Sequence, residues 1–419
     1  MRYLNLLIFF LFAGITVTSS AQPKSGDVYK EYSWTNTKGD CGGTLRVGGD
    51  LGYRKTKMVK GYQGDGSILF DQEVSLKNAI RAELMVEKML CHGRTTGLRI
   101  QFNDKDWITI KESDYIPSPQ TDYAYSANLV TPVALDQLKK GQKNTFKFQV
   151  DTADHWWPQN LVYGMILRVY YDVDIKSPKI FEPTKGEKLS ENVEVKLSSS
   201  NENISKVDFI AHYEGVNFRG DGNYHQWQYQ YHKAKINHHI GTATTAPYSV
   251  NWETGWIPDQ KEKMKLAALI HYQNGYIQFS DVVEGLTLDR EHISVELCKP
   301  YDVPMTWFTR KSAFQQKVEL KGDIEKAVEA KMIFRSWSPG YLNGVYVNDF
   351  VALTRKGPKY DYYVVEEALD ETVMLKKGEN IIKTALTPKY NGHGVHGAEI
   401  LWPGIMFLVK YDNTKKSAH

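Results

Sequence analysis

Histidine side chains gather in three segments of the 419-residue sequence, and imidazole is well suited to moving protons near neutral pH. His155 lies in DTADHWWPQN, His393 and His396 lie in YNGHGVHG, and five more histidines lie in or beside Gly215–Thr245. An ordinary pKa of about 6.5 lets a histidine act as a general base. The candidate catalytic residues are His155, Tyr224, His225, His239, His393 and His396.

Tryptophan and arginine residues near these histidines suit the binding of an anionic sugar. Tryptophan offers a flat apolar face to a sugar ring, and arginine pairs with carboxylate or sulfate groups. A base beside such a cation is what β-elimination needs, because the proton next to a carboxylate leaves only when the developing charge is stabilised. Alternatively, the aromatic residues pack the sandwich edges. The candidate substrate-binding residues are Arg94, Trp156, Trp157, Arg219 and Trp227.

Other chemistries have weaker support in the sequence. His393 and His396 could converge on one metal ion, but no cysteine pair or ordered ligand motif accompanies them. We therefore predict no cofactor and keep a metal as an alternative. Acidic residues for glycoside hydrolysis are present, but no spacing singles out a pair. A serine nucleophile elbow, a P-loop and a dinucleotide-binding glycine run are absent.

The elements that would position these residues are strands, because the sequence repeats a β-type pattern near its two ends. Ala79–Glu87 and Ala327–Arg335 both alternate apolar and polar residues, the period of half-buried strands. LKKGQKNTFKFQV at Leu138–Val150 corresponds to LKKGENIIKTAL at Leu375–Leu386. The order and spacing of the matching segments predict two β-sandwiches of one topology, at about 22–176 and 291–412. Their turn-and-strand signature resembles jelly-roll domains of carbohydrate-active proteins.

The segment between the repeats has a pattern of its own. Its strands resemble bacterial immunoglobulin-like (Ig-like) modules, which predicts a third sandwich at about 184–290. A long aromatic insertion, Gly215–Thr245, interrupts it, and loops of this length are usually functional. We expect the insertion to be ordered and to pack on an outer sandwich. The predicted fold is all-β, with two related jelly-roll β-sandwiches flanking an Ig-like β-sandwich.

Composition and charge exclude several classes of protein. The 52 Lys and Arg residues against 49 Asp and Glu give a formal charge of +3, too small to suggest a nucleic-acid partner. No segment after the first residues is apolar enough to cross a membrane. Residues 1–21 have the pattern of a cleaved signal peptide, which predicts a periplasmic or secreted protein. In an exported protein Cys41 and Cys91 could form a disulfide, or all three cysteines could be buried thiols.

The three-part layout resembles a family of secreted bacterial proteins from polysaccharide-utilisation systems. The resemblance rests on VYGMILRVYYD, HIGTATTAPYSVNWETGWIPDQ and the WPG segment near the end of the chain. It implies a lyase or oligosaccharide dehydratase acting on an anionic, uronate-containing glycan such as ulvan, with a polysaccharide or oligosaccharide as partner. The alternative is a non-catalytic glycan-binding protein. For an enzyme, we expect at least two of the five candidate histidines to share a concave surface with Tyr224 and a basic residue.

Overall fold

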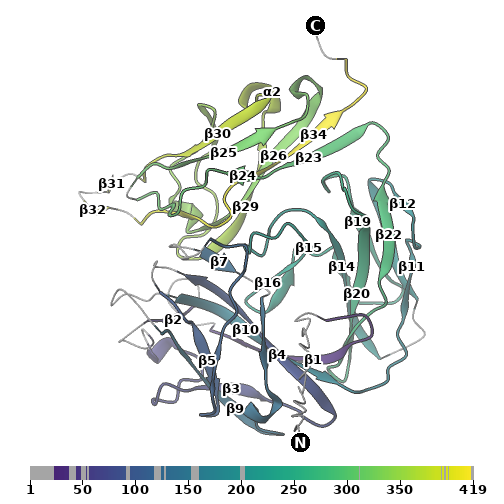
Figure 1. The fold of residues 1–419 in the computed structure, drawn as a ribbon, viewed down its shortest axis with the longest axis vertical. Helices are drawn as coiled ribbons and strands as arrows, with labels where there is room; N and C mark the ends of the chain where they lie inside the picture. The colour runs from purple at the N-terminus through teal and green to yellow at the C-terminus, as the bar shows by residue number, and fades with distance from the viewer. Residues whose placement is uncertain are drawn as a thin grey trace, which may run out of the picture.

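The computed structural model is all-β, and its sheets surround three large hydrophobic cores (Figure 1). It describes residues 23–36, 44–48, 53, 56–90, 95–117, 124–126, 129–151, 160–198, 203–310, 312–387, 389–390, 393–394 and 396–416. In that part of the chain the one α-helix is the single turn α2 (Glu371–Met374), and no helix there is long and apolar enough to span a membrane. The predicted all-β class is confirmed.

The N-terminal sandwich encloses a core that includes Leu84, Phe102 and Phe146. One sheet has the order β1-β10-β4, with β2, β7 and β8 at its edges, and the other has the order β3-β9-β5-β6. The elements are β1 (Val28–Thr35), β2 (Leu45–Val47), η1 (Thr56–Met58), β3 (Ile68–Glu73), β4 (Ala79–Leu90), β5 (Arg99–Phe102), β6 (Trp107–Thr109), β7 (Ala124–Ser126), β8 (Val130–Val133), η2 (Leu135–Gln137), β9 (Lys143–Gln149) and β10 (Asn160–Tyr171).

The C-terminal sandwich has the same strand order. Its sheets run β23-β34-β26-β29 and β25-β30-β27-β28, which match β1-β10-β4-β8 and β3-β9-β5-β6 strand for strand. Two sheets of four strands in this order are consistent with a jelly roll. The elements are β23 (Ile293–Cys298), β24 (Pro300–Tyr301), β25 (Gln315–Leu320), η3 (Ile324–Lys326), β26 (Ala327–Trp337), η4 (Pro339–Tyr341), β27 (Val345–Val347), β28 (Phe350–Leu353), β29 (Tyr362–Leu369), β30 (Gly378–Thr384), β31 (Lys389–Tyr390), β32 (His393–Gly394), β33 (Glu399–Ile400) and β34 (Met406–Asp412).

The asparagine that follows each LKKG motif closes the turn with a set of side-chain hydrogen bonds, which we call the clip. Asn380 is fully buried, accepts from the Lys376 backbone N–H at 2.9 Å and donates to the Lys376 and Gly378 carbonyl oxygens. The Asn348 side-chain amide donates to the side-chain oxygen of Asn380 at 2.6 Å. One buried amide therefore holds the backbone of a turn whose own residues are half-buried or exposed.

The N-terminal copy repeats the clip over a turn that is one residue longer. Asn144 is fully buried, accepts from the Lys139 N–H at 2.7 Å and donates to the Lys139 and Gln142 carbonyl oxygens. Asn103 donates to it at 2.7 Å, as Asn348 donates to Asn380. The two sandwiches thus repeat one fold together with the side chains that close its turns.

The middle sandwich joins the N-terminal one edge to edge, because β21 pairs with β1 and makes one sheet of 13 strands. Its sheets are β11-β13-β19 and β12-β22-β20-β14, consistent with the Ig-like prediction. The elements are β11 (Lys179–Glu182), β12 (Lys188–Leu189), β13 (Asn192–Ser198), β14 (Ile204–Glu214), β15 (His225–Trp227), β16 (Gln230–His232), β17 (Lys235–Asn237), β18 (Gly241–Ala243), β19 (Tyr248–Glu253), β20 (Met264–Tyr272), β21 (Ile277–Phe279) and β22 (Val283–Leu288).

The insertion Gly215–Thr245 packs against both outer sandwiches, as predicted. On the N-terminal side, the Ser113 hydroxyl donates to the Asp221 carbonyl oxygen at 2.6 Å. On the C-terminal side, the buried Arg335 guanidinium donates to the Phe218 carbonyl oxygen at 2.6 Å. The insertion therefore fills the space where the three sandwiches meet. The exact domain boundaries remain predictions.

Candidate functional site

Three separate parts of the chain meet at one cluster of polar side chains, which we call the Glu87 cluster: Glu87, His232 and Tyr362. Glu87 lies near the end of β4, His232 ends β16 in the insertion, and Tyr362 begins β29. Figure 1 shows the start of β29 beside the N-terminal sandwich, with β16 close by. The cluster therefore exists only when all three sandwiches are assembled.

The polar atoms of the Glu87 cluster are within hydrogen-bond distance of one another. His232 Nδ1 lies 3.2 Å from Glu87 Oε1 and 2.5 Å from the Tyr362 hydroxyl. The Tyr362 hydroxyl donates to Glu87 Oε1, and the Lys233 backbone N–H donates to Glu87 Oε2 at 2.6 Å. The Glu87 side chain is 4% exposed and that of His232 is 32% exposed. A buried carboxylate thus holds an imidazole that solvent can reach.

Packing fixes the rings of this cluster. The Tyr362 ring meets the His232 ring edge-on at 4.5 Å and the Tyr163 ring edge-on at 4.7 Å between centroids. Met89, Leu161, Tyr163, Trp337, Tyr362 and Leu401 form a small buried core of their own. The tyrosine hydroxyl is therefore presented from a rigid apolar wall.

The turn after His232 is in an unfavourable backbone conformation. Lys233 and Ala234 are the two turn residues of the β16–β17 hairpin, and both have positive φ, at 48° and 61°. Such turns usually use asparagine and glycine, because other residues are strained there. The Glu87 carboxylate holds the Lys233 N–H, and Asp361 holds its ammonium at 2.8 Å. Backbone strain held by surrounding contacts is common at functional sites.

The hydrogen-bond pattern assigns a chemical role to His232. With Nδ1 protonated, the ring donates to the Tyr362 hydroxyl oxygen at 2.5 Å and toward Glu87 Oε1 at 3.2 Å, and Nε2 is then unprotonated. Nε2 makes no hydrogen bond with the described residues. A half-exposed imidazole held at one nitrogen beside a buried carboxylate is an arrangement that a general base can use.

Sequence analysis missed all three members of the Glu87 cluster. Glu83 and Glu87 share one face of β4, and both are buried. Two carboxylates at this spacing in a largely apolar strand were the signal that could have found Glu87. His232 was noted only as one of several histidines, and nothing in the sequence marks Tyr362.

Several predicted residues lie outside the described residues, and the others do not meet. Arg94, His155, Trp156 and Trp157 are outside, and so is the side chain of His393, whose backbone forms part of β32. The described contacts place His225, His239 and His396 among different partners. The predicted concave surface shared by two histidines and Tyr224 therefore stays a prediction.

His225 and His239 both lie on the middle sandwich. The His225 ring meets His212 edge-on at 4.6 Å, and its Nε2 lies 3.7 Å from Glu262. His239 Nε2 lies 2.7 Å from the Thr242 hydroxyl, and burial lowers the pKa of its imidazole. Neither histidine contacts the Glu87 cluster through the described residues.

The remaining predicted residues inside the insertion are packing residues. Arg219 is buried; its guanidinium lies 5.4 Å from the Tyr229 ring centroid, and it donates to the Trp227 carbonyl oxygen at 3.3 Å. Trp227 packs edge-on against Phe279. Tyr224 is half-buried beneath the Lys299 ammonium, and burial raises the pKa of its hydroxyl. The predicted roles of Arg219, Tyr224 and Trp227 in substrate binding and catalysis stay predictions.

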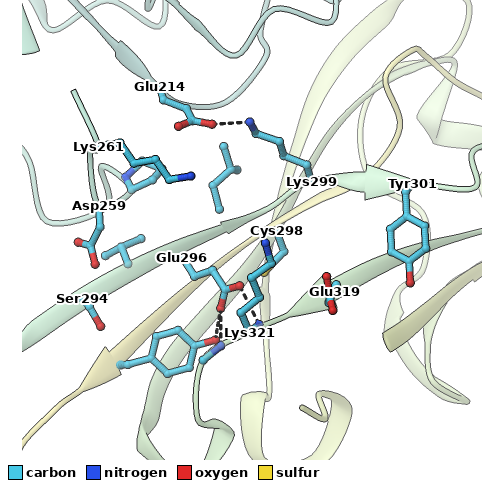
Figure 2. Close-up of a pocket in the computed structure, with 15 residues that line it drawn as sticks. Glu214, Asp259, Lys261, Ser294, Glu296, Cys298, Lys299, Tyr301, Glu319 and Lys321 are labelled. Atoms are coloured by element: carbon cyan, nitrogen blue, oxygen red, sulfur yellow. Dashed lines mark hydrogen bonds and ion pairs between the residues drawn. The ribbon is translucent and has the colours of Figure 1, made fainter. Parts of the chain in front are cut away.

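A cavity of about 470 Å³ lies where the middle and C-terminal sandwiches meet, and no predicted site residue lines it (Figure 2). Glu214 points at the Lys299 ammonium there and forms an ion pair. Glu296 accepts from the Tyr411 hydroxyl at 2.7 Å and from the Gly322 N–H at 3.0 Å. The cavity lining contains no histidine, whereas the Glu87 cluster places a half-exposed imidazole beside a buried carboxylate.

The described residues contain no group of three or more histidine, cysteine or acidic side chains placed to hold a metal ion. Cys298 is a buried free thiol, and Cys41 and Cys91 lie outside the described residues.

No protein-family model matches the chain, and no curated protein matches it. Among solved structures it is similar to BpGH86A, a beta-porphyranase of glycoside hydrolase family 86 from Bacteroides plebeius, with 13% identity, a TM-score of 0.23 and coverage of 59% of this chain and 39% of that one. BuGH86 in complex with neoagarooctaose matches with 11% identity, a TM-score of 0.23 and coverage of 54% and 33%. Fibronectin(III)-like modules of Clostridium thermocellum CbhA match with 13% identity, a TM-score of 0.18 and coverage of 58% and 98%.

The chain thus spans 39% and 33% of the two glycoside hydrolases that it matches. Matches at these TM-scores carry no conclusion about function.

Proposed function

We propose that this protein is an exported, carbohydrate-active enzyme that carries out an elimination on an anionic, uronate-containing polysaccharide or its oligosaccharides. The observation that carries the proposal is the Glu87 cluster, in which a buried carboxylate orients a solvent-accessible imidazole. Elimination next to a uronate carboxylate needs one positioned base and no redox group. His232 supplies that base.

His232 can carry out both proton transfers of the reaction. Nε2 takes the proton from the ring carbon that bears the carboxylate, and the electron pair of that C–H bond forms a double bond to the neighbouring carbon. The C–O bond on the neighbouring carbon breaks, and the imidazolium returns its proton to the departing oxygen. The departing group is a sugar alcohol in a lyase and water in a dehydratase.

The residues around His232 stabilise the two states of this step. Glu87 stabilises the imidazolium, because the carboxylate lies 3.2 Å from Nδ1. Tyr362 and the Lys233 N–H hydrogen-bond the same carboxylate and hold it in place. The Lys233 ammonium follows His232 in the hairpin turn and forms an ion pair with Asp361 at 2.8 Å. Its side chain is 30% exposed, so it could exchange this partner for a uronate carboxylate.

The alternative is a glycan-binding protein without activity. The exposed ring of Tyr360, which is 38% exposed, favours this alternative because stacking a sugar needs no base. Under that alternative the Glu87 cluster would be an interface between sandwiches and nothing more.

A panel of anionic polysaccharides and oligosaccharides separates the two functions. An eliminating enzyme produces an unsaturated uronate that absorbs ultraviolet light, and a binding protein produces none. Mass spectrometry of the products then distinguishes a lyase, which splits the chain without adding water, from a dehydratase, which removes one water from an intact oligosaccharide. Binding without product on every glycan would establish the alternative.

A further inference from the structure

A cluster of aromatic rings surrounds His396 on the C-terminal sandwich, beside the Glu87 cluster. The centroid of the His396 ring lies 5.3 Å from those of Trp337 and Tyr360, 6.2 Å from that of Tyr341 and 6.3 Å from that of Phe308. Trp337 and Phe308 are buried, whereas Tyr360 is exposed and Tyr341 and His396 are half-buried. We call the outer rings, Tyr341, Tyr360 and His396, the His396 platform.

Two exposed cations flank the His396 platform. The Lys359 ammonium lies 4.9 Å from the Tyr341 ring centroid, and the Arg310 guanidinium lies 4.7 Å from that of Phe308. Neither cation forms an ion pair with a described carboxylate. Both are therefore available to an anion from solvent.

His396 is suited to stacking because it is uncharged near neutral pH. Burial, followed by the positive charges of Arg310 and Arg46, lowers the pKa of its imidazole. The Trp337 ring, which contacts His396, belongs to a buried core that also contains Met89, Leu161 and Tyr163 of the N-terminal sandwich. The platform therefore lies near the junction of the two outer sandwiches.

Trp337 connects the His396 platform to the Glu87 cluster. It lies directly opposite Tyr362 in the β26–β29 pair, so both side chains share one face of the sheet. The two rings belong to the same small buried core. The Trp337 ring also contacts Tyr360 and His396, so one ring separates Tyr362 from the platform.

We propose that the His396 platform is a sugar subsite of the enzyme proposed above, on which it rests. A pyranose ring next to the reacting uronate stacks on the exposed Tyr360 ring and lies against Tyr341, whose ring stands at 80° to that of Tyr360. Its anionic substituent binds Arg310 and Lys359. The substituent is a sulfate ester or a carboxylate, which share the chemistry of a compact oxyanion. The subsite selects anionic oligosaccharides long enough to reach from His232 to the platform.

The test uses the full chain and three variants at the platform: Tyr341→Ala, Tyr360→Ala and the double variant Arg310→Gln/Lys359→Gln. Tyr301→Ala is the matched control, because Tyr301 is also exposed, at 42%, and lines the cavity of Figure 2. Each protein is assayed on oligosaccharides of increasing length, sulfated and desulfated. Binding is measured by calorimetry in a His232→Ala background, where we expect product to form roughly 10²–10⁴-fold more slowly.

We expect each tyrosine variant to raise KM and Kd for the longer oligosaccharides about three- to tenfold, the worth of one aromatic contact, with kcat nearly unchanged. The double variant should reduce the preference for whichever oligosaccharide carries the anion that binds there, sulfate or carboxylate. Tyr301→Ala should match wild type. Unchanged KM and Kd in all platform variants would overturn the subsite while product formation still supported the enzyme. Binding that depends on the platform but yields no product would retain the subsite as a binding surface and overturn the proposed enzyme. Absence of platform-dependent binding and of product would overturn the subsite and the enzyme together.

Discussion

The Glu87 carboxylate carries the electrostatic part of the proposed site. It is buried, and it accepts hydrogen bonds from the Tyr362 hydroxyl and the Lys233 backbone N–H while lying 3.2 Å from His232 Nδ1. A charged acceptor fixes Nδ1 as the protonated nitrogen more firmly than a neutral one, because the hydrogen bond is charge-assisted. The reactivity of His232 therefore depends on Glu87.

Replacing Glu87 with glutamine tests this dependence at almost constant shape. The amide removes the charge and can donate to Nδ1, which would move the histidine proton to Nε2 and block the base. We expect kcat for elimination to fall roughly 10²–10⁴-fold, the usual worth of a general base. The substitution should change the melting temperature only slightly, because the shape of the side chain is almost unchanged. An E87Q enzyme with wild-type kcat would show that the carboxylate has no part in the reaction.

The lowered pKa of His212 makes the free energy of unfolding depend on pH. Burial, with added repulsion from His225, Lys265 and Arg219, lowers the pKa of its imidazole from 6.5 to about 4. Between these values the unfolded chain binds a proton that the folded chain does not, so the free energy of unfolding falls as pH falls through this window. We expect the urea midpoint to drop between about pH 6.5 and about pH 4 and His212→Gln to flatten the drop. His292→Gln, at an exposed position, should leave it unchanged.

At the scale of elements, the sequence predicted the strands of the outer sandwiches well, because their pattern is local and occurs twice. The LKKG segments predicted a turn leading into a strand, and the structure adds the reason for the asparagine that follows. Asn144 and Asn380 each close a turn with one buried side chain. The alternation predicted for β4 and β26 holds only at their starts, because residues 82–89 and 332–337 are buried on both faces.

Asn380→Ala tests the clip. The substitution leaves the Lys376 N–H and the Lys376 and Gly378 carbonyl oxygens without their partner. These backbone groups are exposed or half-buried and can bind water instead, so we expect a loss of about 1–3 kcal/mol of stability by chemical denaturation. Asn413→Ala, at an exposed position with a single weak hydrogen bond, is the control. Equal stability of the two variants would refute the role of the clip.

The site could not be predicted from the sequence because its members are distant in the chain. Glu87 is 145 positions from His232 and 275 from Tyr362, and no local pattern encodes contacts at such separations. The insertion stood out through its length and aromatic content, but which of its histidines faces a carboxylate depends on the β16–β17 turn. The residues predicted at the site were chosen by type, and type alone cannot distinguish a packing histidine from a base.

At the scale of the whole molecule, the insertion contacts both outer sandwiches and fixes their relative position. The buried Arg335 donates from the C-terminal sandwich to the Phe218 carbonyl oxygen of the insertion and to the Trp402 carbonyl oxygen at 3.0 Å. Gly220 lies against this guanidinium so closely that an added Cβ would collide with it. The position of Tyr362 relative to Glu87 depends on this contact between sandwiches.

Gly220→Ala therefore serves as a test of the assembly. Alanine would displace Arg335 and also strain a backbone with φ of 66°. Gly186→Ala has the same kind of strain, with φ of 80° and open space around it, and so measures strain alone. We expect Gly220→Ala to lower both the melting temperature and kcat more than Gly186→Ala does. Matching losses in the two variants would show that the contact does not position the site.

The central claim is that His232 is the base of an elimination, and a single-turnover experiment tests it most directly. Wild type, His232→Ala and the exposed control His292→Ala are each mixed in excess with a uronate oligosaccharide, and formation of the unsaturated product is followed by ultraviolet absorbance. We predict that His232→Ala slows the step roughly 10²–10⁴-fold with Kd nearly unchanged, and that His292→Ala behaves as wild type. A His232→Ala rate equal to that of the control would contradict the account.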